Sequence, residues 1–147
     1  MLLVTGNTQG WSIVGSGTAP TATPYGGSKM AMFNSYNISS GSSRIYRSSS
    51  FAIPSSVTTV TLTLFMYHDS GYATSGDTIQ TQISTDGGTT WNDVGTVIAR
   101  YSAVVGWAQH TIDLSPYKGQ TVILGFLGTS GYGNNMYLDD ILVTGTN

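Results

Sequence analysis

The segment MYHDSGYATSGDTIQTQIS, residues 66–84, brings together side chains that could do chemistry: His68, Asp69 and Asp77. They lie in the connection between two segments that alternate like β-strands. Histidine and carboxylate side chains can transfer protons, carboxylates can bind hard cations, and aspartate also starts tight turns. The segment therefore has three possible roles, namely catalysis, cation binding and turn formation.

Catalysis is the least favoured of the three. All seven acidic residues are aspartates, so the chain has no glutamate, and it has no cysteine. Glycoside hydrolysis usually needs two carboxylates that flank the scissile bond, and one of them is commonly glutamate. His68 and His110 alternate with aliphatic residues, which is typical of hydrogen-bonded core or edge histidines. Because there is also no Gly-x-Ser-x-Gly elbow, phosphate-binding loop or His-x-x-x-His spacing, we expect no enzymatic activity.

A structural calcium ion is the cation that suits this composition, because calcium takes roughly six to eight oxygen ligands from carboxylates, amides and backbone carbonyls. The segment MYLDDILVTG, residues 136–145, alternates strictly, so a carboxylate falls on whichever face is turned to the core. A buried carboxylate needs a cation, hydrogen bonds or an arginine such as Arg44 or Arg100. The predicted calcium ligands are Asp139, Asp140, Asp69, Asp77 and Asn34.

Turn formation is the alternative for the aspartates of the loops. Asp69, Asp77 and Asp86 all stand where an aspartate could bond its own backbone at the start of a turn. Asp86 is followed by Gly87 and Gly88, which is a hairpin signal because glycine tolerates positive φ.

Aromatic and amide side chains form a second group with a defined chemistry. Neutral sugars are bound by rings that stack on their faces and by amides that bond their hydroxyl groups. The chain has nine Tyr and three Trp, and only 8% of its residues are charged. The alternative for each ring is packing in the core or on a sheet. The predicted sugar-binding residues are Trp91, Trp107, Tyr72, Tyr101, Tyr132, Asn134, Asn135, Gln80 and Gln82.

Charge and hydropathy exclude two classes of partner. The five basic residues form no cluster, so no nucleic-acid partner is expected. No stretch approaches the ~20 apolar residues that span a bilayer, so no membrane insertion is expected, and the start MLLVTGN is too short for a signal peptide. A polar, weakly charged chain without cysteine is typical of many secreted modules, which predicts an extracellular or cell-surface location.

The elements that must position these side chains are β-strands. Apolar residues recur at every second position, and Gly, Ser, Asn and Pro interrupt them at short intervals. No helix of normal length is predicted. The expected fold class is all-β, a two-layer antiparallel β-sandwich or jelly roll of about nine or ten strands. The predicted strands cover residues 29–36, 43–53, 60–67, 79–83, 91–98, 107–114, 121–128 and 136–145.

One short sequence occurs twice. Ser70-Gly71-Tyr72 and Ser130-Gly131-Tyr132 both follow strongly apolar segments. Two tripeptides indicate shared turn chemistry rather than an internal repeat.

The hairpin from Gln82 to Trp91 and the segment from Gly106 to Gly145 resemble MAM-like and cleaved-adhesin-like jelly rolls of secreted bacterial and archaeal proteins. The segments GGSKMAMFNS and SRIYRSSSFAIP look like the first half of these domains, so the resemblance spans nearly the whole chain. It implies structural calcium bound by the aspartate of the last strand, here Asp139, and by an acidic residue near the amino terminus. In that second region this chain has Thr5 and Asn7 instead.

These observations predict that residues 1–147 form one β-sandwich module of a larger secreted protein. The predicted function is noncatalytic carbohydrate binding with a structural calcium ion. The predicted partners are a polysaccharide or glycan and the neighbouring domains of the parent protein. The alternative is a structural or adhesive spacer domain of a cell-surface protein or hydrolase, without sugar binding of its own.

Overall fold

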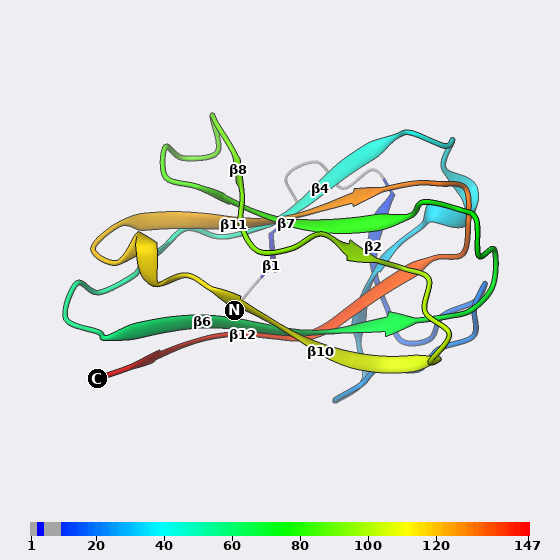
Figure 1. Ribbon diagram of the computed structural model, residues 1–147, viewed down its shortest axis with the longest axis horizontal. Helices are drawn as coiled ribbons and strands as arrows, with labels where there is room; N and C mark the ends of the chain where they lie inside the picture. Colours follow the sequence, from blue (N-terminus) through cyan, green and yellow to red (C-terminus); the bar gives the residue numbers. More distant parts are fainter. Residues whose placement is uncertain (1–2, 5–9) are drawn as a thin grey trace.

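The computed structural model describes residues 3–4 and 10–147, and two antiparallel β-sheets lie face to face in it (Figure 1). The seven-stranded sheet has the order β1-β4-β11-β7-β8, with β5 paired to β11 and β9 paired to β7. The five-stranded sheet has the order β10-β6-β12-β3-β2. The predicted all-β sandwich is confirmed.

Eight strands have four residues or more: β2 (Trp11–Val14), β3 (Met30–Phe33), β4 (Ser43–Ser48), β6 (Thr59–His68), β7 (Thr78–Ser84), β10 (Gly106–Asp113), β11 (Thr121–Thr129) and β12 (Met136–Thr146). Four have two residues: β1 (Leu3–Val4), β5 (Phe51–Ala52), β8 (Asn92–Asp93) and β9 (Ile98–Ala99). The predicted number of nine or ten lies between the eight long strands and the twelve strands of all lengths in the described residues. The described helices are the short 3-10 turns η1 (Ser35–Asn37) and η2 (Ser115–Tyr117), and neither could cross a membrane.

The core lies between the two sheets, where alternation along β6 and β7 predicts it. Leu62, Leu64 and Met66 of β6 are fully buried, and they face the sheet that contributes Ile79 and Ile83. Burying each such side chain stabilises the fold by about 1.5–3 kcal/mol relative to exposure. The predicted strand over residues 91–98 is broken in the structure, because Gly95 has a φ of 72° between β8 and β9.

A β-bulge in β12 changes which face of this strand looks into the core. Asp139 pairs with Phe65 and Leu142 pairs with Thr63, so β12 has one residue more than β6 over this interval. The backbone of Asp140 takes a positive φ of 44° at the extra residue.

The bulge corrects the prediction that a carboxylate of β12 must be buried in the core. Before the bulge, Leu138 faces the core, and after it Ile141 and Val143 do so. Asp139 is half-buried and Asp140 is exposed. Strict alternation would have turned one of these aspartates inward, and the extra residue keeps both outside.

Candidate functional site

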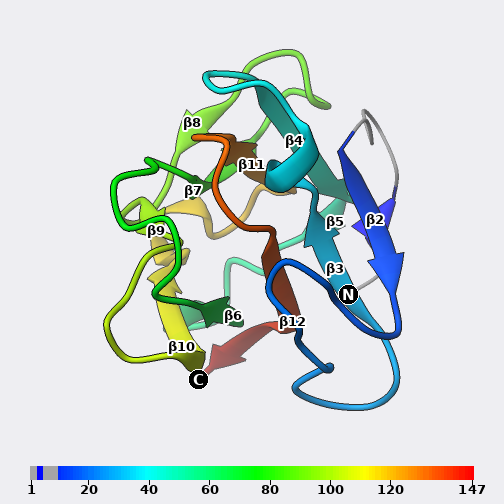
Figure 2. The same cartoon turned by 90° about the vertical axis from the view of Figure 1, so that its right-hand side faces the viewer.

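A buried ionic cluster underlies one end of the sandwich, the end that Figure 2 turns towards the viewer. Asp69 follows β6, Asp77 precedes β7 and Arg100 follows β9. Arg100 Nη1 lies 2.6 Å from Asp69 Oδ1, and Arg100 Nε lies 3.0 Å from Asp77 Oδ2. All three side chains are buried, and that of Arg100 has no exposed surface. We call these three residues the Arg100 cluster.

The remaining oxygens of the Arg100 cluster bind the loops around it. Asp77 Oδ1 accepts hydrogen bonds from the hydroxyl of Ser35, from Gly131 N at 2.7 Å and from Gly133 N at 3.1 Å. Burial alone would raise the pKa of Asp77, but these bonds and the one from Arg100 outweigh burial, so the pKa lies below its ordinary value. Asp77 is therefore ionised at neutral pH.

Asp69 and Arg100 complete the network on the other side. Asp69 Oδ2 accepts hydrogen bonds from Gly71 N at 3.1 Å and from Asn134 Nδ2 at 2.6 Å. Arg100 Nη2 donates to the carbonyl oxygen of Tyr72 at 2.9 Å. The loop that precedes β7 and the loop that precedes β12 are thus fastened to the same three charged side chains.

The alternative in which an arginine pairs with Asp139 or Asp140 is wrong for the described residues. Arg100 pairs with Asp69 and Asp77, because its side chain enters the sandwich at the end where β6 stops and β7 starts. Arg44 donates instead to the carbonyl of Ser43. The connection from β6 to β7 does hold a positive group, and that group is a guanidinium of this chain.

Exposed tyrosines stand on the fastened loops. Tyr72 is 54% exposed and Tyr132 is 61% exposed, and Tyr36 of η1 is 42% exposed. The ring centroids of Tyr36 and Tyr72 are 6.5 Å apart. We call this surface, formed by Tyr36, Tyr72 and Tyr132, the tyrosine end.

The two Ser-Gly-Tyr tripeptides take up a similar backbone. Tyr72 has a φ of 47° and Tyr132 has a φ of 62°, a left-handed conformation that a bulky residue rarely adopts. In each tripeptide the glycine N–H donates to a carboxylate of the Arg100 cluster, Gly71 to Asp69 and Gly131 to Asp77. The cluster therefore holds both tyrosines in a backbone conformation that would otherwise cost free energy.

Three further predicted residues lie near this end, with different roles. Tyr101 is 41% exposed, and its backbone forms an isolated bridge with Asp69. The amide of Asn134 is bonded to Asp69, and Asn135 accepts a hydrogen bond from Tyr36 N and donates to the carbonyl of Thr18. Both asparagines position the loops, because their amides are occupied by protein partners.

A second aromatic surface lies on the outer face of the five-stranded sheet. The ring of Tyr25 stacks on Phe65 with centroids 3.7 Å apart, and Trp107 packs edge-on against Tyr25 and Tyr67. Trp107 Nε1 donates to the carbonyl of Thr23. Trp107 thus packs against the sheet, and its hydrogen bond holds the loop before β3. This agrees with the alternative in which the ring packs on a sheet.

The remaining predicted residues lie on the outer face of the seven-stranded sheet. Gln80 donates to backbone carbonyls, among them that of Val94, and Gln82 donates to Asp93 Oδ1. Trp91 packs over Gly125, where a Cβ atom would come within 2.9 Å of the indole ring. The nine predicted sugar-binding residues therefore lie on three separate surfaces rather than in one site.

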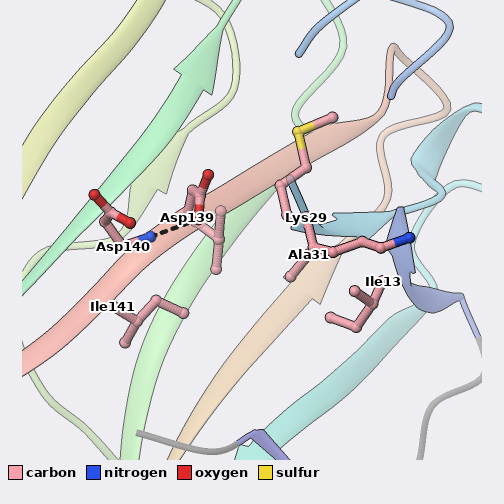
Figure 3. A pocket seen from close by; sticks show the side chains of 8 residues that line it. Ile13, Lys29, Ala31, Asp139, Asp140 and Ile141 are labelled. Carbon is pink, nitrogen blue, oxygen red and sulfur yellow. Dashed lines mark hydrogen bonds between the residues drawn. The ribbon is translucent and has the colours of Figure 1, made fainter. Parts of the chain in front are cut away.

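Asp139 and Asp140 lie beside a cavity of about 280 Å³ on the five-stranded sheet (Figure 3). Asp139 Oδ2 accepts hydrogen bonds from Tyr25 N at 2.8 Å and Gly26 N at 3.2 Å, and its Oδ1 accepts one from Asp140 N at 2.8 Å. The Lys29 side chain lines the same cavity and extends away from both carboxylates.

The surroundings of Asp139 differ from those of a calcium site. The partners of Asp139 are N–H donors, whereas calcium requires oxygen ligands. Asn34 Oδ1 likewise accepts from Asn37 Nδ2. Within residues 3–4 and 10–147, no three histidine, cysteine or acidic residues gather as metal ligands. Calcium binding stays a prediction, and Thr5 and Asn7 lie outside the described residues.

Two residues of these surfaces were missed by the sequence analysis. Tyr25 lies in a segment without regular alternation, and Tyr36 falls at the end of the strand predicted over residues 29–36, whereas β3 ends at Phe33 and Tyr36 belongs to η1. The proximity of Tyr36 to Tyr72 arises from Asp77, which accepts from Ser35 beside Tyr36. A signal for Tyr36 could have come from treating every aromatic residue next to Ser, Gly or Asn as a loop candidate.

Comparison with known proteins identifies similar folds without a shared family. No protein-family model and no curated protein sequence matches the chain. The K1 cleaved adhesin domain of Lys-gingipain from Porphyromonas gingivalis is similar, with a TM-score of 0.63, 14% identity and coverage of 99% of this chain and 89% of that chain. The resemblance to cleaved-adhesin domains is thus confirmed for the fold.

Carbohydrate-binding modules have similar structures as well. TmCBM61, solved in complex with beta-1,4-galactotriose, has a TM-score of 0.61 and 12% identity, with coverage of 95% of this chain and 85% of that chain. The CBM22-1 xylan-binding domain from Paenibacillus barcinonensis has a TM-score of 0.55 and 14% identity, with coverage of 97% and 89%. At such identities the likeness concerns the fold alone.

Proposed function

We propose that this chain is a noncatalytic carbohydrate-binding module of an extracellular protein, and that the tyrosine end is its binding surface. The observation that carries this proposal is the pair of exposed tyrosines, Tyr72 and Tyr132, in left-handed backbone on loops fastened to the Arg100 cluster. Backbone strain of this kind costs on the order of 1–3 kcal/mol per residue and is concentrated at binding and catalytic sites. A tyrosine ring loses little conformational entropy on binding, because it has two side-chain torsions.

The charge of this end supports a neutral ligand. Asp69, Asp77 and Arg100 are buried and paired with one another, so they present no ionic group to a ligand. The exposed groups of Tyr36, Tyr72 and Tyr132 are apolar ring faces that end in hydroxyls. A neutral sugar offers the matching pattern of C–H faces and hydroxyl groups.

The fold neighbours support the same class of function. TmCBM61 is described in complex with beta-1,4-galactotriose, and the CBM22-1 domain is described as xylan-binding. A β-sandwich of this kind can carry sugar recognition without catalysis. The absence of glutamate among the acidic residues agrees with a role without glycoside hydrolysis.

The proposal is tested by binding to a panel of soluble and insoluble neutral polysaccharides, including β-1,4-galactan and xylan. We expect saturable binding, and we expect Tyr72→Asn and Tyr132→Asn each to weaken it by at least about tenfold, or 1.4 kcal/mol. Asparagine is the suitable replacement, because it tolerates positive φ and removes the ring without new backbone strain. The measurements are depletion assays and isothermal titration calorimetry.

A matched control separates the tyrosine end from the second aromatic surface. Tyr25→Ala removes a ring of similar exposure, 48%, that stacks on Phe65 away from the Arg100 cluster. We expect this variant to bind as tightly as the wild type. Loss of binding in Tyr25→Ala, with retention in both asparagine variants, would move the site to the five-stranded sheet.

The second candidate function is a spacer or adhesive domain. The likeness to a cleaved adhesin domain of Lys-gingipain favours it. In that role the contacts are made with neighbouring protein domains, and none of the polysaccharides is bound. An absence of binding across the whole panel would favour this candidate over sugar recognition.

A further inference from the structure

Two histidines meet at the open edge of the sandwich, outside the tyrosine end but next to the Arg100 cluster, because His68 directly precedes Asp69. His68 is the last residue of β6, and His110 lies on the adjacent strand β10. Their Nε2 atoms are 3.0 Å apart, and their ring centroids are 5.2 Å apart. His68 is buried, with 8% of its surface exposed, and His110 is half-buried. The histidine pair is thus fixed between two strands rather than free in solvent.

The hydrogen bonds determine which nitrogen of His68 carries the proton. His68 Nδ1 lies 3.1 Å from the carbonyl oxygen of Arg100, and a carbonyl can only accept. The Nδ1 atom is therefore the donor, and the Nε2 atom of the neutral ring has a free lone pair directed at His110. This is the orientation of metal-binding histidines, which usually donate their second ring N–H to a carbonyl or carboxylate.

A cavity gives solvent access to the pair. Its volume is about 410 Å³, and it lies between β9 and β10, at the edges of the two sheets. Its lining is His68, His110, residues 96–99, Thr111 and Ile112. No carboxylate lines it, so water is the remaining source of ligands. The cavity is wide enough for several waters, because each needs about 30 Å³ of liquid volume.

The separation of the two nitrogens matches a shared metal ion. An imidazole nitrogen binds zinc at about 2.0–2.1 Å. Two such bonds at about 90–109° place the nitrogens roughly 2.9–3.4 Å apart. The observed 3.0 Å lies in this range, so the two nitrogens keep their separation on binding, while each ring turns until its Nε2 lone pair points at the ion instead of at the other ring.

We propose that His68 and His110 bind one divalent transition-metal ion of the zinc or copper type through their Nε2 atoms, with water completing the coordination. Imidazole suits these ions, whereas calcium prefers oxygen ligands. Without metal, His110 Nε2–H donates to His68 Nε2. On binding, the proton of His110 moves to its own Nδ1 through solvent, so the neutral rings release no net proton.

The protonation state of His110 agrees with this assignment. Burial, and in second place the nearby His68, lowers the pKa of His110 below its ordinary value. A lowered pKa favours the neutral form of the ring, which is the form that binds metals. Within the described part of the chain no third histidine, cysteine or acidic residue completes a cluster with the pair. Two protein ligands make an open site with exchangeable positions.

The test uses the whole chain and two metals in a buffer that does not chelate. We expect isothermal titration calorimetry with ZnCl₂ to give one saturable site per chain, and His110→Ala to weaken it at least tenfold. Asp139→Asn is the matched control, because it removes the charge of a half-buried carboxylate on another surface, and we expect its zinc affinity to be unchanged. Equal affinity in the wild type and His110→Ala would overturn the proposal, as would the absence of saturable binding.

A second measurement needs no variant, so it decides the question even if His110→Ala fails to fold. We expect the electron paramagnetic resonance spectrum of the wild-type chain with one equivalent of Cu²⁺ to show coupling to two imidazole nitrogens. A spectrum with oxygen ligands alone, or with one nitrogen, would contradict shared coordination. Neither His68 nor His110 belongs to the tyrosine end, and neither measurement uses a sugar, so a failure of this proposal is distinguishable from a failure of sugar binding.

Discussion

Arg100 is fully buried, and its guanidinium bonds two buried carboxylates and a backbone carbonyl. A buried ion pair adds little stability compared with apolar packing, but removing one partner leaves the other charges uncompensated. We expect Arg100→Met to lower the free energy of unfolding by about 3–5 kcal/mol, measured by urea denaturation. Arg47→Met is the control, because Arg47 is half-buried and no described carboxylate pairs with it. Similar losses in both variants would contradict this role of the cluster.

Three carboxyl groups with lowered pKa values, Asp77, Asp86 and Asp113, set the acid limit of stability. The pKa of Asp77 lies below its ordinary value, and hydrogen bonds from Thr90 and Ser84 lower the pKa of Asp86 to about 2. Such groups stabilise the folded state above their unfolded pKa of about 3.9, and this contribution is lost as the pH falls through the folded pKa. The lowered pKa of His110 acts in the same direction from about pH 6.5 downwards.

We therefore expect the free energy of unfolding to fall with decreasing pH, with a further loss below about pH 4 from the three aspartates. The measurement is urea denaturation at a series of pH values at constant ionic strength. An unfolding free energy that is the same at about pH 5 and about pH 2.5 would contradict the pKa directions.

The pairing of Arg100 could not be predicted from the sequence. Its partners are 23 and 31 residues away along the chain, and the arginine lies in a segment without regular alternation. The turn at Asp86 could be predicted, because the hydrogen bonds that Asp86 Oδ1 accepts from the N–H groups of Thr89 and Thr90 are local. Local chemistry is readable from neighbouring residues, whereas partners across the sandwich depend on the register of several strands.

At the scale of the element, the bulge of β12 separates two leucines that strict alternation places on the same face. Leu138 is 1% exposed and faces the core, whereas Leu142 is 53% exposed. We expect Leu138→Ala to lower the free energy of unfolding by about 2–5 kcal/mol, because it leaves a cavity. Leu142→Ala is expected to change it by less than about 0.5 kcal/mol, as a surface substitution. Equal losses in urea denaturation would show a strand without the bulge.

Period-two patterns predicted the long strands and failed where a strand is irregular. The positions of β6, β7 and β11 agree with the prediction, because each is regular over its whole length. The bulge at Asp140 and the break at Gly95 have backbones with positive φ. Glycine marks the second of these in the sequence, but aspartate at the first adopts such a backbone less often, so its signal is weak.

At the scale of the whole molecule, Asp139 has two possible roles: it could bind calcium, or it could only hold the loop of Tyr25 and Gly26 against β12. Asp139→Ala removes the acceptor of three backbone N–H groups. We expect this substitution to lower Tm by the same amount in calcium and in EDTA. For a chain of this size, a loss of about 1 kcal/mol in the free energy of unfolding lowers Tm by roughly 2–4 °C. A wild-type Tm that falls in EDTA, with no such fall in Asp139→Ala, would instead establish the predicted calcium ion.

The sandwich could be predicted from composition and alternation, but the distribution of its aromatic residues could not. Trp107 and Trp91 are alike in the sequence as rings that flank strands, yet they pack on the outer faces of opposite sheets. The register of strand pairing determines which face of a sheet a ring occupies. The paths of the loops determine which parts of that face they cover. Both are properties of the assembled molecule.

The separation between the Arg100 cluster and the rings above it makes this end of the sandwich suited to diversification. The cluster fastens the loops through backbone groups and buried side chains, so the identities of residues 36, 72 and 132 can vary while the frame persists. Positions 72 and 132 accept residues that tolerate left-handed backbone, which directs a randomised library towards asparagine, aspartate, glycine and histidine. Descendants of this chain could thus acquire new specificities without evolving a new scaffold.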